Sequence, residues 1–153
     1  MANFMLNIAK GRFVEFMNRV DSNDPANSAI ILVPLSASDT EANTQDFDDL
    51  TAFLGGTPNE QTGGGWVRKV LTDVELSAIA VDDTNNRFPA TLPQVTWTAP
   101  AAASNTTGLA ICYDSDTTSG TDANIIVIAH CDFVVTADGN DVVLTTGDFA
   151  RAS

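Results

Sequence analysis

Basic residues are scarce in this chain. It contains 7 Lys and Arg against 20 Asp and Glu in 153 residues, which gives a formal net charge of −13. Because proteins that bind DNA or RNA neutralise phosphates with lysine and arginine, the folded surface is not expected to bind nucleic acid. Charged residues make up only 18% of the chain and hydrophobic residues 44%, a composition that favours a folded domain over a disordered chain.

Long apolar runs are also absent from the sequence. The longest candidates, Ala29–Leu35 and Ile125–Ala129, have the length of strands and fall well short of the roughly 20 residues that span a bilayer. Lys10 and Arg12 interrupt the segment Met1–Val20 where a secretory signal would be continuously apolar. We therefore expect no membrane segment and no secretory signal, and we expect synthesis in a cytoplasm.

The chain has only two cysteines, and both lie in apolar runs typical of strands. A hairpin centred near Ser119 would place Cys112 beside Ile126, about 16 Å along the strand from Cys131. The two sulfur atoms of a disulfide are far closer than that, so no disulfide is expected. Both cysteines are predicted to be buried and unreactive.

His130 is the single histidine and therefore the first residue to consider for catalysis. In a strand, His130 and Cys131 point to opposite faces, so they cannot form a nucleophile–base pair. His130 and Asp132 share a face, which predicts a surface histidine satisfied by a nearby carboxylate. With so few ligands we predict no metal site, no cofactor and no enzymatic activity.

Helical periodicity is confined to two stretches. Apolar residues at spacings of three and four predict an N-terminal helix over Met1–Val20, which Asp21–Pro25 would end. A second, short helix is predicted over Asp46–Leu54, followed by Gly55–Gly56. Ser36–Gln45, which lies between the predicted strand Ala29–Leu35 and the second helix, is predicted to be a polar loop.

Short β segments account for most of the remaining chain. Their regular spacing is typical of a mainly β, single-domain antiparallel β-sandwich with a jelly-roll-like arrangement. The sandwich is predicted over residues 26–148, after an N-terminal helix or arm over residues 1–22, within one domain 1–153. Asp138–Asn140 is predicted to be a hairpin turn. The predicted strands are Ala29–Leu35, Trp66–Leu71, Val74–Val81, Phe88–Leu92, Gln94–Thr98, Gly108–Asp114, Ala123–Val135 and Asp141–Thr146.

Two features outside the strands are candidates for binding. The acidic loop Asp114–Asp122 has carboxylates at the first and third positions of a calcium loop, but Ser119 replaces the required glycine and the closing glutamate is missing. We therefore predict an ordinary solvated hairpin loop. Trp66 follows three glycines, and its side chain is predicted either to join the core or to anchor a partner.

The order of the segments, rather than any single motif, resembles a known group of proteins. The pieces that carry the resemblance are the helix pattern Lys-x-x-Phe-x-x-Phe, Ile-Ile-Leu-Val-Pro-Leu, Asp-Phe-Asp-Asp-Leu, Val-Asp-Asp-Thr-Asn-Asn-Arg-Phe, Val-Thr-Trp and Tyr-Asp-Ser-Asp. In this order they resemble small virion structural proteins of tailed bacteriophages. The resemblance extends from Lys10 to Thr146, and the segments Asn59–Gly65 and Pro100–Ala103 depart from it.

The resemblance implies a capsid decoration (cement) protein on the outside of the phage head. Such a protein binds and stabilises the shell of the major capsid protein, and it forms a homo-oligomer, most often a trimer. Two alternatives stay open: a tail, neck or fibre component of the same virion, and a carbohydrate- or receptor-binding β-sandwich that uses Trp66, Tyr113 and the acidic loop.

The predicted interface combines N-terminal residues with residues near Trp66. The segment Met1–Arg12 could extend along a partner as an arm or pack on its own domain. From Asp114 to Ser153 there are seven Asp and only Arg151, which predicts acidic loops toward solvent and a basic N-terminal end toward the partner. The interface residues that we predict are Phe4, Met5, Lys10, Arg12, Trp66 and Arg68.

Overall fold

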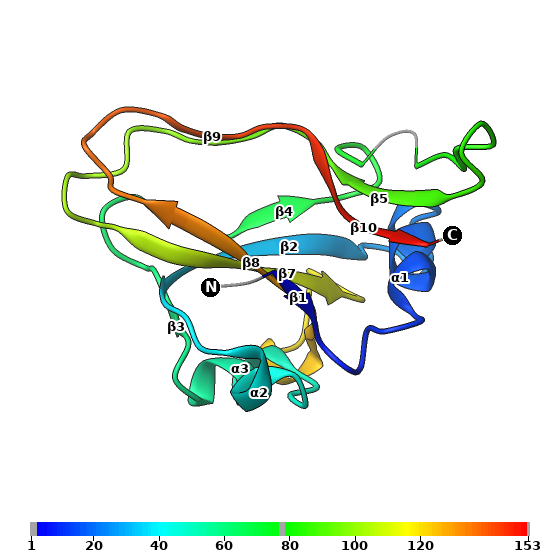
Figure 1. The fold of residues 1–153 in the computed structure, drawn as a ribbon, viewed down its shortest axis with the longest axis horizontal. Coiled ribbons are helices and arrows are strands. Elements are labelled where there is room, and N and C mark those ends of the chain that lie inside the picture. Colours follow the sequence, from blue (N-terminus) through cyan, green and yellow to red (C-terminus); the bar gives the residue numbers. More distant parts are fainter. Residues whose placement is uncertain (1–2, 77–78, 153) are drawn as a thin grey trace.

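The computed structural model describes residues 3–76 and 79–152, which form a β-rich domain with antiparallel sheets (Figure 1). Its main element is a six-stranded sheet in the order β1-β8-β7-β2-β3, in which β4 also pairs with β2. These strands are β1 (Phe4–Met5), β2 (Ala29–Ala37), β3 (Asn59–Glu60), β4 (Lys69–Leu71), β7 (Thr106–Asp114) and β8 (Ile126–Val135).

Two small sheets complete the β structure. One pairs β5 (Phe88–Leu92) with β10 (Gly147–Ala152), and the other pairs β6 (Val95–Trp97) with β9 (Val142–Leu144). Figure 1 shows these strands on one side of the six-stranded sheet.

The helices are short. They are α1 (Phe13–Asp21), α2 (Glu41–Thr44), α3 (Leu50–Gly55) and the 3-10 helix η1 (Asp122–Asn124). Asp49 caps α3, since its Oδ1 accepts a hydrogen bond from the Ala52 backbone nitrogen at 2.8 Å. Within residues 3–76 and 79–152, no helix is long and apolar enough to cross a membrane.

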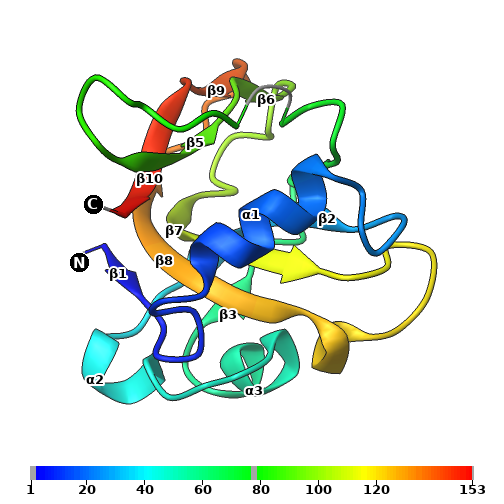
Figure 2. The ribbon, with the colours of Figure 1, turned by 90° about the vertical axis from the view of Figure 1, so that its right-hand side faces the viewer.

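The centre of the large sheet consists of β2 and β7, which pair over Ala29–Leu35 and Gly108–Asp114, with Ile31 opposite Cys112. Both strands carry apolar side chains on both faces, so both faces of the sheet must be covered to keep these side chains from water. α1 and the small sheets cover one face, which includes Leu32 and Ile111. α3 covers the other face, which includes Val33, and Figure 2 shows α2 and α3 on this side.

The prediction of one helix over Met1–Val20 is confirmed for Phe13–Val20 and wrong for residues 3–12; residues 1–2 lie outside the described residues. Phe4–Met5 form β1, which pairs with β8, and the helix begins only at Phe13. Gly11 has a φ of +81°, a conformation that interrupts a helix. Because Phe4 and Leu6 are buried against the domain, this segment packs on its own chain rather than projecting as an arm.

Three further predictions need correction. The predicted strand Val74–Val81 is wrong over residues 74–76, which form a turn held by Thr72 and Glu75, and over residues 79–81, which are in no strand; residues 77–78 lie outside the described residues. The predicted loop Ser36–Gln45 contains the end of β2 and the helix α2. Asp138–Asn140 bends the chain but does not join paired strands, since β9 pairs with β6 rather than with β8.

Candidate functional site

The N-terminal part of the predicted interface lies at one edge of the six-stranded sheet. Phe4 is buried, with 9% of its surface exposed, whereas Met5 is half-buried and Lys10 and Arg12 are exposed. β1 carries the first two residues, and the turn before α1 carries the other two. Met5, Lys10 and Arg12 are therefore accessible to a partner in a single subunit.

The basic side chains at this end are already paired with acidic neighbours. Lys10 Nζ lies 3.7 Å from Glu41 Oε1, Arg12 Nε lies 3.4 Å from Glu15 Oε2, and Arg19 Nε lies 2.9 Å from Glu15 Oε1. All three pairs are solvent-exposed, so each contributes little to the stability of the fold. Glu15 and Glu41 therefore neutralise part of the positive charge at the predicted basic end, which the sequence alone did not indicate.

Trp66 does not anchor a partner from the surface of the subunit. It is 2% exposed, and its Nε1 donates a hydrogen bond to the Ser104 carbonyl oxygen at 2.5 Å. Its ring centroid lies 5.4 Å from that of Trp97 and 6.1 Å from that of Phe133. The alternative that places Trp66 in the core is confirmed, and the alternative that exposes it is wrong.

Arg68 is engaged within its own subunit. Its guanidinium donates two hydrogen bonds of 2.6–2.8 Å to the Glu60 carboxylate and two of the same length to Asp122. Asp122, followed by Glu60, raises the pKa of the guanidinium, and Arg68 holds the pKa of Asp122 below its usual range. These two bidentate contacts link β3 to η1, so the role of Arg68 within the subunit is to stabilise the fold.

The six predicted interface residues do not form one surface in a single subunit. Phe4 and Met5 lie on β1 at one edge of the sheet, while Arg68 bonds to Glu60 on β3 at the opposite edge. Strands β8, β7 and β2 separate the two edges. The sequence could not reveal this separation, because it follows from the order of the strands.

His130 is buried rather than on the surface. Its exposed fraction is 0%, and neither ring nitrogen has a hydrogen-bond partner among the described residues. The ring stacks on Phe4, with centroids 5.1 Å apart and planes inclined by 20°. Burial lowers the pKa of the imidazole, which Asp132 opposes. The prediction of a surface histidine satisfied by Asp132 is wrong, because β1 covers this part of β8.

Gly108 makes room for the His130 ring, and sequence reasoning missed this role. A Cβ atom at Gly108 would lie 2.5 Å from His130 Nε2 and would also overlap Ser38 Oγ. A glycine inside an apolar strand is the signal that indicates such a close approach.

Gly108→Ala is expected to lower the free energy of unfolding by about 1–3 kcal/mol, because His130 and Ser38 must move. Urea denaturation measures the change. Gly147→Ala is the matched control, since a Cβ there would meet nothing closer than the Thr145 carbonyl oxygen at 4.0 Å. Equal effects of the two substitutions would contradict the packing described for Gly108.

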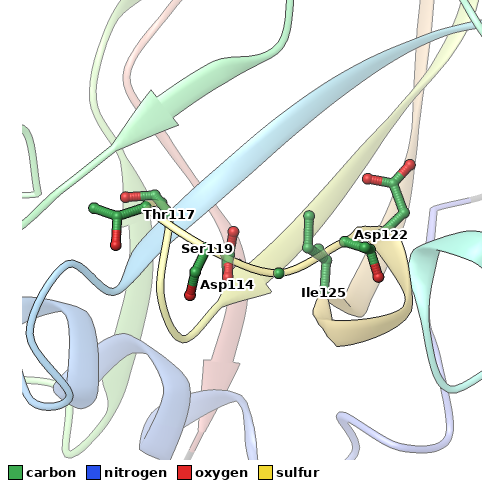
Figure 3. Close-up of a pocket in the computed structure, with 8 residues that line it drawn as sticks. Asp114, Thr117, Ser119, Asp122 and Ile125 are labelled. Atoms are coloured by element: carbon green, nitrogen blue, oxygen red, sulfur yellow. The ribbon is translucent and has the colours of Figure 1, made fainter.

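The acidic loop forms a pocket of ≈ 210 Å³ between β7 and η1 (Figure 3). Its carboxylates have partners: Asp114 accepts from the Asp116 backbone, Asp116 accepts from Thr118 and Ser119, and Asp122 accepts from Arg68. Among the residues that the structure describes, no group of three or more His, Cys, Asp and Glu could hold a metal ion. The carboxylates stabilise the loop and its neighbours.

Tyr113 is also unavailable to a ligand. It is 4% exposed and stacks on Phe16 with ring centroids 4.9 Å apart. Its hydroxyl, more than Glu15, raises the pKa of the neighbouring Arg19. Because Trp66 is buried as well, the aromatic residues of the predicted carbohydrate-binding face are not on the surface.

Both cysteines are free thiols. Cys112 faces Val127 across the β7–β8 pair, whereas Cys131 faces Leu109, three residues away along β7. Burial raises the pKa of Cys131 to about 11 and that of Cys112 further, so both thiols are protonated at neutral pH. Neither thiol is therefore an activated nucleophile.

Comparison with known proteins adds no relative. No family model, no curated protein and no solved structure matches this chain. Its function is therefore inferred from its own residues and from the order of its sequence segments.

Proposed function

We propose that this chain is a non-enzymatic structural protein of a bacteriophage virion, a capsid decoration (cement) protein that binds and stabilises the shell of the major capsid protein. The observation that carries the proposal is the order of segments from Lys10 to Thr146, which resembles small virion proteins of tailed phages. The proposal places the protein on the capsid exterior, as a homo-oligomer with three subunits, after synthesis in the host cytoplasm.

The surface of the subunit is compatible with this role. Decoration depends on surface complementarity, and the exposed side chains of Lys10 and Arg12 lie beside the edge strand β1. The net charge of −13 would keep free subunits soluble and away from nucleic acid. In this proposal the small sheets and the six-stranded sheet form the two layers of a jelly-roll-like sandwich.

Copy number in the virion separates decoration from a tail, neck or fibre role. An icosahedral shell repeats each binding site many times, so decoration requires on the order of hundreds of copies. Quantitative mass spectrometry of purified particles and a cryo-EM map give the number and the location. A dozen copies or fewer, or density confined to the tail, would overturn the proposal.

Arg12→Glu is expected to weaken binding to undecorated heads by about tenfold, because it reverses an exposed charge at the proposed contact. Folding should be preserved, since an acidic residue at the start of α1 is favourable. Co-sedimentation of the purified protein with heads measures the affinity. Arg87→Glu is the control with the same change of charge; equal loss of binding in both variants would exclude this contact.

A further inference from the structure

β1 is held on the large sheet by few contacts. It contributes two residue pairs, Phe4 with His130 and Met5 with Ala129, and within residues 3–76 and 79–152 it pairs with β8 alone. Asn3 adds a hydrogen bond, in which its Oδ1 accepts from the Asp132 backbone nitrogen at 2.7 Å. On its other side a pocket of ≈ 250 Å³ lies between β1 and β10, and Figure 2 shows β1 at the edge of the sheet.

The side chain beneath this strand is the buried His130. Phe4 of β1 stacks on one side of the ring, and Gly108 of β7 leaves the space that Nε2 occupies. None of the neighbours Phe4, Gly108 and Ser38 carries a charge. Asp132, on its own strand, and the α-amino group of the chain have opposite effects on the pKa of the imidazole. On β10, Arg151 lines the pocket that His130 also lines, and it is paired with Asp148.

We propose that β1 is a pH-sensitive latch, which closes over His130 while the imidazole is neutral and leaves the edge of β8 when the imidazole is protonated. A buried imidazolium without a partner is unfavourable, and release of β1 would expose it to water. The central strand β7 cannot move as easily, because it pairs on both sides.

The opening has a natural limit at Leu6. This residue is fully buried, and its backbone nitrogen donates to the Ile128 carbonyl oxygen at 2.9 Å. The next residue, Asn7, donates from its backbone to Gln45 and from its side chain to Asp46. The latch therefore consists of Asn3–Met5, and the rest of the domain keeps its fold.

The direction of the pH dependence follows from the lowered pKa of the closed state. In the open state His130 has its ordinary pKa of about 6.5, so the open state binds the proton more tightly. Opening increases as the pH falls below about 6.5, by up to about tenfold per pH unit until the closed-state pKa is reached. Above about pH 7 the latch stays closed regardless of pH.

Hydrogen exchange of the intact chain tests the latch. As the pH falls from about 7.5 to about 5, the opening equilibrium of the backbone amides in Asn3–Met5, corrected for intrinsic exchange, is expected to increase by up to about tenfold per pH unit below about pH 6.5. The amides of Ile30–Val33 in the central strand β2 should not change. In His130→Leu the increase should vanish, and this variant should fold, because leucine places an apolar side chain where an unpartnered polar ring was buried.

The ring itself provides a second measurement, since His130 is the single histidine and its proton resonances are unambiguous. A titration linked to the exchange of Asn3–Met5 supports the latch. Titration at about pH 6.5 without faster exchange of β1 would overturn it. So would pH-dependent exchange that persists in His130→Leu, or pH-dependent exchange that appears equally in Ile30–Val33.

Discussion

Trp97→Ala is expected to lower the free energy of unfolding by about 3–5 kcal/mol. Trp97 is fully buried, and its Nε1 donates to the Val67 carbonyl oxygen at 2.8 Å. Its ring centroid lies 5.4 Å from the centroids of both Trp66 and Phe133, so it joins β6 to the six-stranded sheet. Alanine would leave a cavity and an unpaired carbonyl, and urea denaturation would show the loss as an earlier transition.

Val143→Ala is the matched control for this substitution. Val143 lies opposite Thr96 on β9, the strand that pairs with β6, but 46% of it is exposed. Its truncation should change stability by less than about 1 kcal/mol. A Trp97→Ala variant as stable as Val143→Ala would show that the three rings do not connect the small sheet to the large one.

Arg68→Ala is expected to lower the free energy of unfolding by about 2–3 kcal/mol. The substitution leaves the Glu60 and Asp122 carboxylates, which are 19% and 35% exposed, without the cation that binds both. Removing one partner of a partly buried ion pair costs more than the pair itself contributes, although the remaining exposure reduces the cost below that of a fully buried pair. Arg151→Ala is the control, because its pair with Asp148 is more exposed on the arginine side.

The loss of stability in Arg68→Ala should also depend on pH, in a direction that the ion pair determines. Arg68 lowers the pKa of Asp122, so this carboxylate stabilises the wild-type fold above its unfolded pKa of about 3.9, and the contribution is lost as the pH falls through the folded pKa. The stability difference between wild type and Arg68→Ala should therefore be largest above about pH 4 and decrease below it. A difference that stays constant down to about pH 2 would contradict the ion-pair assignment.

The predicted elements were accurate where burial alone decided them. Ala29–Leu35 and Gly108–Asp114 are the cores of β2 and β7, and Phe88–Leu92 matches β5. Continuous apolar runs have to be buried on both faces, so their assignment as buried strands follows from composition. Val74–Val81 is also rich in apolar residues, but its described residues do not form a strand. Glu75 accepts hydrogen bonds from Thr72 and closes a turn there.

Candidate site residues were harder to predict, because exposure depends on segments that are distant in sequence. Trp66 follows three glycines, yet Trp97 and Phe133 enclose it. Arg68 has no acidic neighbour within three residues on either side, yet it binds Glu60 and Asp122. Long-range pairs of this kind leave no periodic signal in the sequence.

The sequence by itself determined that this chain forms a β-rich antiparallel domain with strands over Ala29–Leu35 and Gly108–Asp114, because their apolar residues require burial. That these strands pair as β2 and β7 at the centre of the large sheet was decided by the tertiary structure. Only the tertiary structure decided what covers the edges. β1 has two residues and β10 lacks a regular apolar alternation, so their places beside β8 and β5 depend on the strand edges available to them. The burial of His130 follows from that edge pairing, since the stacked Phe4 belongs to a strand more than a hundred residues earlier.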